Sequence, residues 1–120
     1  MKSNGKINYL ELPARDLAAT KQFFNDVFGW MFADYGEDYS AFFNAGLDGG
    51  FHRSTQQSKS DTGAVLPVIY ATDLETMQQK IEAHGGIINR AVFDFPGGRR
   101  FHFLDPNGNE WAVWSDDEEK

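Results

Sequence analysis

The sequence predicts a mixed α+β fold built from two tandem β-α-β-β-β modules, and a repeated pattern is the main reason. An extended apolar segment is followed by Asp16-Leu17 and a helical pattern, and the same order recurs at Asp73-Leu74. The helical pattern ends at Gly29 in the first copy and at Gly86 in the second. A single repeat of this length indicates a duplicated module, since a solenoid needs three or more units to bury its core.

The first module begins with residues 7–12, where apolar and polar side chains alternate with the period of a half-buried strand. Asp16 is a suitable N-cap for the helix that follows, and Gly29 supplies the stop. Three short strands are expected after this helix. They cover residues 30–34, 39–44 and 49–53.

The second module repeats this order, with a strand at 66–71, a helix capped by Asp73 and two short strands at 87–89 and 92–95. Two final strands, at 99–104 and 109–115, form the clearest hairpin of the chain. Its turn has Asp105 first, Pro106 second and Gly108 fourth, which are the residues that a type I turn prefers.

These elements predict a single domain that contains both modules. Module one covers 6–53 and module two covers 64–115. The segment 54–63 is polar and without periodicity, so it is interpreted as a linker, and 116–120 form an acidic tail.

Composition favours a protein that acts on small molecules. The net charge is −7, which disfavours nucleic acid and favours a cationic ligand. There is no cysteine, so disulfides and thiolate chemistry are excluded. Residues 1–6 lack the apolar run of a signal peptide and no segment is long enough to cross a bilayer, so we expect a cytoplasmic protein without a membrane partner. The 18 aromatic residues (11 Phe, 4 Tyr and 3 Trp) exceed what a core of this size needs, and some are expected to line a ligand cavity.

Three segments together resemble the glyoxalase/bleomycin resistance/extradiol dioxygenase group, the vicinal oxygen chelate superfamily. They are LELPARDLAATKQFFNDVFGW, VIYATDLETMQQKIEAHGG and GRRFHFLDPNGNEWAVW. The FGW and DPNGNE motifs are similar to a bacterial subgroup related to lactoylglutathione lyase. The resemblance implies two modules whose mixed sheets curl around a cavity, a small-molecule ligand and a homodimer.

The resemblance also tests for a metal centre. The ligand positions of the family's metal enzymes fall on Tyr9, His52, Pro67 and Ala112. A catalytic divalent metal needs about three histidine or carboxylate ligands, and His52 alone is credible here. We therefore predict that the usual metal site is absent, that no cofactor is required, and that glyoxalase I or dioxygenase activity of the usual kind does not occur.

Strand alternation predicts which side chains face the cavity. If Tyr9 and Ala112 point inward, Glu11 and Glu110 do as well, and the neighbouring strand contributes its even-numbered residues. The predicted catalytic carboxylates are Glu11 and Glu110. The predicted ligand-binding residues are Tyr9, His52, Arg100, His102 and Trp114.

Three functions remain open at this point. The first is a lyase or isomerase that uses Glu11 or Glu110 as a carboxylate base, with His52 or His102 as the acid. The second is a non-catalytic protein of the antibiotic-resistance type, which sequesters a cationic compound in an acidic groove. The third is a metal enzyme with atypical ligands, His52 together with Glu11 or Glu110. A purely structural interpretation also exists for each residue, such as an ion pair between Glu11 and Arg100.

Overall fold

The computed structural model describes residues 2–116, and the chain divides into two compact units, Met1–Gln57 (unit 1) and Ser58–Lys120 (unit 2). Unit 1 contains β1 (Tyr9–Ala14), α1 (Leu17–Phe28), β2 (Met31–Asp34), β3 (Tyr39–Phe43) and β4 (Asp48–Arg53). Unit 2 contains the 3₁₀ helix η1 (Ser60–Thr62), β5 (Val68–Tyr70), α2 (Leu74–Ala83), β6 (Ile87–Phe95), β7 (Gly98–Leu104) and β8 (Glu110–Ser115). The predicted α+β class with two β-α-β-β-β modules is confirmed.

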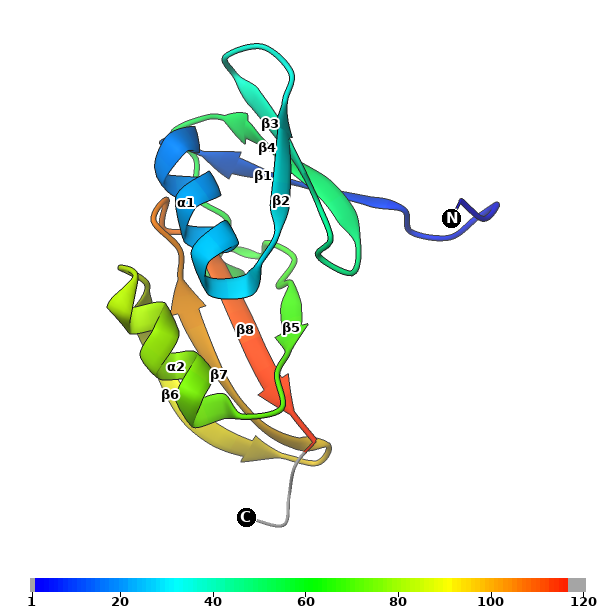
Figure 1. Ribbon diagram of the computed structural model, residues 1–120. Coiled ribbons are helices and arrows are strands. Elements are labelled where there is room, and N and C mark those ends of the chain that lie inside the picture. The colour runs from blue at the N-terminus through cyan, green and yellow to red at the C-terminus, as the bar shows by residue number, and fades with distance from the viewer. Residues whose placement is uncertain (1, 117–120) are drawn as a thin grey trace. The chain divides into compact units, whose positions relative to one another are not determined.

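In unit 1, four strands form a sheet in the order β1-β4-β3-β2, with β1 parallel to β4 and the other neighbours antiparallel. Helix α1 covers one face of this sheet (Figure 1). The core lies between them, where Phe24 stacks on Trp30 at 4.7 Å and on Phe51 at 5.5 Å between ring centroids. Leu12 is buried on the side of α1, whereas Tyr9 and Glu11 lie on the other side and are exposed.

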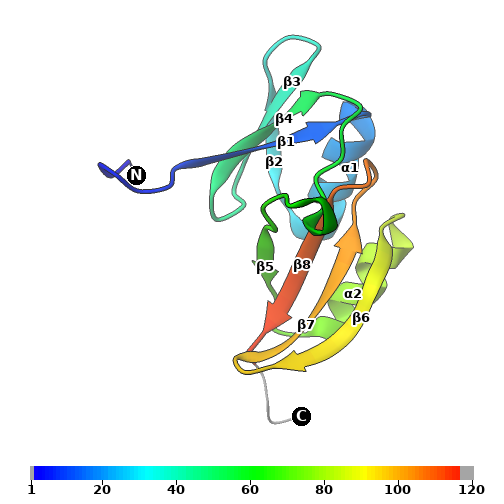
Figure 2. The same cartoon turned by 180° about the vertical axis from the view of Figure 1, so that it is seen from behind.

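Unit 2 repeats this plan with the strand order β5-β8-β7-β6, and β5 runs parallel to β8. Figure 2 shows α2 against the face formed by β6, β7 and β8. The side chains that this face buries are Phe101, Phe103, Trp111 and Val113. We call the opposite side of each sheet, turned away from its own helix, the distal face. In unit 1 it carries Tyr9, Glu11, Tyr39, Gly50 and His52, and in unit 2 Tyr70, Arg90, Phe93, Phe95, Arg100, His102, Glu110 and Trp114.

The two helices begin in the same way. Asp16 has extended backbone angles (φ −129°, ψ 96°) and its carboxylate accepts a hydrogen bond from Ala19 N at 3.0 Å. Asp73 has nearly equal angles (φ −135°, ψ 98°) and accepts from Thr76 N at 3.1 Å. Both are therefore N-caps, as the repeated Asp-Leu pair predicted.

Three strand boundaries differ from the prediction. Strand β1 continues through Pro13, which was expected to end it, because β1 is an edge strand where a missing N–H is tolerated. Strand β5 is shorter than expected and starts after Pro67. The two strands predicted at 87–89 and 92–95 are one strand, β6, whose pairing with β7 shifts register twice, between Ile88 and Arg90 and between Arg90 and Phe93.

The hairpin between β7 and β8 is confirmed, since Gly108 N donates to the carbonyl of Asp105 at 2.9 Å and closes the turn. The segment expected to be an unstructured linker is partly ordered by unit 2, because Ser58 N donates to the Asn109 side chain at 2.9 Å and η1 follows. Of the predicted acidic tail, only Asp116 belongs to the described residues. No helix within residues 2–116 has both the length and the apolar character required to span a membrane.

Candidate functional site

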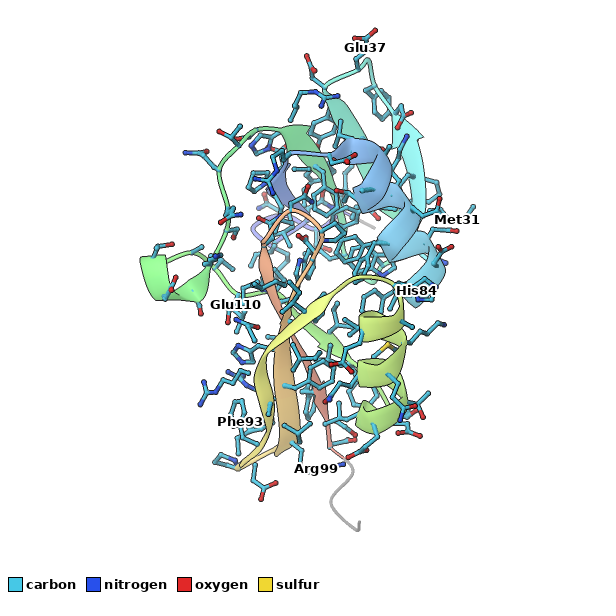
Figure 3. All side chains as sticks on the ribbon, turned by 90° about the vertical axis from the view of Figure 1, so that its left-hand side faces the viewer. Met31, Glu37, His84, Phe93, Arg99 and Glu110 are labelled. Atoms are coloured by element: carbon cyan, nitrogen blue, oxygen red, sulfur yellow. The ribbon has the colours of Figure 1, made fainter. Side chains whose placement is uncertain are left out.

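The distal face of unit 2 carries a buried pair formed by His102 on β7 and Glu110 on β8. His102 is 3% exposed and Glu110 is 7% exposed. The imidazole Nδ1 lies 2.7 Å from one carboxylate oxygen of Glu110. The other oxygen accepts hydrogen bonds from the Ser60 backbone N–H at 2.8 Å and from the Ser60 hydroxyl at 2.6 Å. Figure 3 shows Glu110 at the start of β8 beside η1, the element that supplies Ser60.

These contacts decide the protonation of Glu110. Burial alone would raise the pKa of the Glu110 carboxyl, but the hydrogen bonds from Ser60 and His102 outweigh burial and lower the pKa to about 2. A carboxylate with so low a pKa is a weak base, and it is better suited to hold a neighbouring group in place. Since an ionised carboxylate only accepts hydrogen bonds, His102 Nδ1 carries the proton. In the neutral imidazole, Nε2 then presents a lone pair.

His102 Nε2 has no partner. It is buried and forms no hydrogen bond with any residue that the structure describes. A buried polar atom without a partner costs about 1–3 kcal/mol, so such atoms are usually satisfied by a ligand or by water. The pair therefore places one reactive nitrogen on the distal face, with a carboxylate behind it that fixes its orientation.

Aromatic side chains lie on the same face as this pair. The ring of Phe93 lies 5.8 Å from the imidazole of His102. Trp114 packs edge-on against Tyr70 at 5.2 Å and against Phe95 at 6.0 Å, measured between ring centroids. Phe93 lies on β6, the edge strand of the sheet, as Figure 3 shows. The distal face of unit 2 is thus an aromatic surface with one buried acid–base pair.

The distal face of unit 1 has a different chemistry. The phenol of Tyr39 donates to the Glu11 carboxylate at 3.0 Å and lies 2.7 Å from the phenol oxygen of Tyr9. Because the Tyr39 proton is used by Glu11, the Tyr9 hydroxyl is the donor to Tyr39. Burial, followed by these two hydrogen bonds, raises the pKa of Tyr39 well above its usual value. The arrangement is a chain of two phenols that ends on a carboxylate.

Gly50 leaves room for these hydrogen bonds, because a Cβ at that position would overlap the phenol of Tyr39. His52, two residues further along β4, pairs with Tyr39 on β3 and with Pro13 on β1. It is half-buried, and its imidazole makes no hydrogen bond within residues 2–116. His52 is therefore on the predicted face but outside the Tyr9–Tyr39–Glu11 chain.

Unit 1 also has a pocket of about 380 Å³ beside the first turn of α1, at the turn between β2 and β3 that contains Glu37 (Figure 3). Four of the charged groups at this pocket or beside it form two ion pairs. Lys21 pairs with Asp34 at 2.9 Å, and Arg53 pairs with Asp38 at 2.8 Å. No role is assigned to this pocket.

The structure brings the predicted residues together within each unit. Tyr9 and Glu11 are joined through Tyr39, which the sequence reasoning did not select. Arg100, His102, Glu110 and Trp114 share the distal face of unit 2, as alternation predicted. Ser60 was missed because it lies in a polar segment without periodicity. Tyr39 begins a strand that the sequence does predict, and the pairing of that strand with the one that carries His52 was the information lacking.

The donor set at the family's ligand positions does not fit a divalent metal. Ala112 N donates to the carbonyl of Pro67 at 3.0 Å, so these two positions are neighbours, but their side chains have no ligating atom. By register, Val68 and not Pro67 shares the face of Ala112, and valine cannot ligate either. In unit 1 the Tyr9 phenol is already hydrogen-bonded, which leaves the imidazole of His52. One imidazole is short of the three ligands that a catalytic metal needs.

Tyr39→Phe is expected to lower the free energy of unfolding by about 1 kcal/mol, because Glu11 and Tyr9 each lose a hydrogen bond to the Tyr39 hydroxyl. Urea denaturation at pH 7 measures this change. Tyr35→Phe is the matched control, since Tyr35 is 68% exposed and its phenol has no partner within residues 2–116. Equal stability of both variants would show that the Tyr9–Tyr39–Glu11 hydrogen bonds do not stabilise the fold.

Two sheets of this topology, each with one helix, define the fold of a known class of proteins that bind small molecules. A model of the Glyoxalase/Bleomycin resistance protein/Dioxygenase superfamily matches residues 6–113, and the chain belongs to this superfamily. The family predicted from the sequence is therefore confirmed.

Individual relatives are more distant. The anthracycline biosynthesis protein DauV of Streptomyces sp. (strain C5) is 29% identical over 88% of this chain and 45% of its own length, so the chain spans about half the length of the curated relatives it matches. The fosfomycin resistance protein FosX of Listeria monocytogenes has a TM-score of 0.76 at 17% identity, covering 96% of this chain and 94% of its own. Lactoylglutathione lyase of Agrobacterium tumefaciens has a TM-score of 0.70 at 20% identity, covering 95% and 96%. These two structures show the fold alone.

Proposed function

We propose that this protein binds a planar aromatic small molecule on the distal face of unit 2 and does so without a divalent metal. The observation that carries the proposal is the group of aromatic side chains on that face. Its members are Tyr70, Phe93, Phe95 and Trp114. Tyr70 is 49% exposed, and aromatic rings displayed beside polar groups are typical of ligand sites.

The relatives support the same ligand class. DauV and DnrV are named for anthracycline biosynthesis, and an anthracycline contains a planar fused-ring system. Because the chain spans about half of these relatives, their activity comes to this chain as part of the proposal only. The donor set at the ligand positions, with one imidazole and one phenol, supports the metal-free part.

A second candidate function is acid–base catalysis of the lyase or isomerase type, and the His102–Glu110 pair favours it. Glu110 fixes the imidazole through Nδ1, and Nε2 is left to take or return a proton of a bound compound. In this version His102 is the base and Glu110 the positioning residue, which reverses the roles expected from the sequence. A metal enzyme with His52 and a carboxylate has no comparable support. We also propose a homodimer and a cytoplasmic location, as the resemblance and the composition suggest.

Isothermal titration calorimetry with 2-naphthamide and its anthracene homologue, two neutral planar probes, tests binding. We expect saturable binding by the wild type and a loss of about threefold to tenfold in affinity for Trp114→Leu, because an aromatic contact contributes about 0.5–1.5 kcal/mol. Tyr35→Leu, which removes an exposed aromatic side chain of unit 1, is the control and should bind as the wild type does. If neither probe binds, the proposal is contradicted. A compound that is recovered chemically changed from the wild type but intact from His102→Gln supports catalysis.

A further inference from the structure

Two arginines lie on the distal face of unit 2 among its aromatic rings. The guanidinium carbon of Arg90 lies 3.9 Å from the ring centroid of Phe93. That of Arg100 lies 5.3 Å from Phe93 and 5.6 Å from Phe95. The two arginines come from neighbouring strands, because Arg90 pairs with His102 and Arg100 pairs with Phe93 in the β6–β7 ladder. Their positive charges are therefore concentrated on one part of the sheet.

Neither charge is neutralised within the described part of unit 2, residues 58–116. Within residues 2–116, no carboxylate forms an ion pair with Arg90 or Arg100, and the Nε of Arg100 is buried without a hydrogen-bond partner. The next residue, Arg99, points the other way and pairs with Glu75 on α2 at 3.0 Å.

The buried pair does not supply the missing negative charge. Both oxygens of the Glu110 carboxylate are occupied, one by Ser60 and one by His102. The neighbouring Nε2 of His102 supplies no negative charge either, since in the neutral imidazole it carries only a lone pair. The side chain of Arg90 lies opposite this imidazole in the β6–β7 register.

We propose that Arg90 and Arg100 bind a carboxylate group of the aromatic ligand, whose ring lies against Phe93, Phe95 and Trp114. A guanidinium matches a carboxylate in shape and binds it through two parallel N–H···O bonds, which also satisfies the buried Nε of Arg100. This inference rests on the proposed function and adds the charge of the ligand. It differs from the cationic ligand that the net charge of −7 suggests, because net charge describes the whole surface and not this face.

A matched pair of probes tests the inference, 2-naphthoate and its neutral analogue 2-naphthamide, titrated by calorimetry at low ionic strength. We expect wild-type protein to bind 2-naphthoate at least tenfold more tightly than 2-naphthamide. Arg100→Gln should lose at least tenfold in affinity for 2-naphthoate and less than twofold for 2-naphthamide, with a smaller loss for Arg90→Gln. Arg99→Gln, which removes a charge from the other face, is the control and should retain the preference.

The outcomes separate the two proposals. Equal wild-type affinity for both probes overturns the carboxylate site and leaves the aromatic site in place. Absence of binding by both probes overturns both proposals. Arg100→Lys covers the case in which Arg100→Gln does not fold, because it keeps the charge and removes the planar fork. The preference of Arg100→Lys for 2-naphthoate over 2-naphthamide should lie between those of the wild type and Arg100→Gln. A preference equal to that of the wild type would show that the planar guanidinium fork is not used.

Discussion

Asp105→Ala is expected to lower the free energy of unfolding by about 3–5 kcal/mol, a loss at the upper end of single substitutions. The Asp105 side chain is buried and accepts three hydrogen bonds in the hairpin turn. Its donors are Asn107 N at 2.8 Å, Asn109 N at 3.1 Å and Trp111 Nε1 at 3.0 Å. Alanine would leave these buried N–H groups without their acceptor. Urea denaturation at pH 7 measures the change.

Asp94→Ala is the control for this experiment, since Asp94 on β6 is exposed and its side chain has no partner within residues 2–116. A change within about 0.5 kcal/mol is expected for it, as for most surface substitutions. If Asp105→Ala were equally mild, the turn would owe its stability to Pro106 and Gly108 rather than to the carboxylate.

The same residue predicts a pH dependence. Burial raises the pKa of Asp105 from 3.8 to about 6, although the hydrogen bonds from Trp111, Asn107 and Asn109 oppose the shift. Because the folded protein holds this proton more tightly than the unfolded chain, the stabilising contribution of the protonated carboxyl is complete below pH 4 and is lost as the pH rises through 6. The stability difference between wild type and Asp105→Asn should shift against the wild type by up to about 3 kcal/mol from pH 4 to pH 7. A difference that stays constant over this range would disprove the assignment.

Glu110→Ala is expected to cost about 2–4 kcal/mol at pH 7, because two donors of Ser60 and one of His102 lose a buried acceptor. The pH dependence has the opposite sign to that of Asp105. The pKa of Glu110 is lowered from 4.5 to about 2, so its contribution is present above pH 4.5 and is lost as the pH falls through 2. Acid titration of wild type and Glu110→Gln, followed by circular dichroism, should show up to about 3 kcal/mol of this loss in the wild type only.

Glu82→Gln on α2 is the matched control, since Glu82 is exposed and its carboxylate has no partner within residues 2–116. A spectroscopic readout adds the orientation of the imidazole. The ¹⁵N shifts of His102 should report a proton on Nδ1 in the wild type and a changed tautomer in Glu110→Gln, because an amide can donate to Nδ1. An unchanged tautomer would show that Glu110 does not position the ring.

The helices and strands of this fold were largely predictable because their ends are set by residues close in sequence. Asp16 and Asp73 cap the helices with their own side chains, and Asp105 to Gly108 form their turn within four residues. The predicted strand boundaries are wrong where pairing with a neighbouring strand determines them. Pro13 stays in β1 because that strand lies at a sheet edge. β6 remains one strand because β7 pairs with both of its ends, on either side of the two register shifts.

The candidate site was predictable to the extent that it follows from alternation. That rule predicts that Arg100, His102, Glu110 and Trp114 share one face, and the β7–β8 register agrees. Alternation gives directions but not partners, so it did not reveal that Glu110 is occupied by Ser60, nor that Arg90 joins Arg100. The first depends on a segment distant in sequence, and the second on the register shifts within β6.

Those register shifts have a further consequence for association. A regular, flat border strand presents an unbroken row of amide and carbonyl groups, which invites a strand of another molecule to add to the sheet. Along β6 the row is interrupted on both sides of Arg90, and that charged residue sits at the interruption. An irregularity of this kind, with a charged residue beside it, disfavours the addition of a strand from another molecule to the β6 edge.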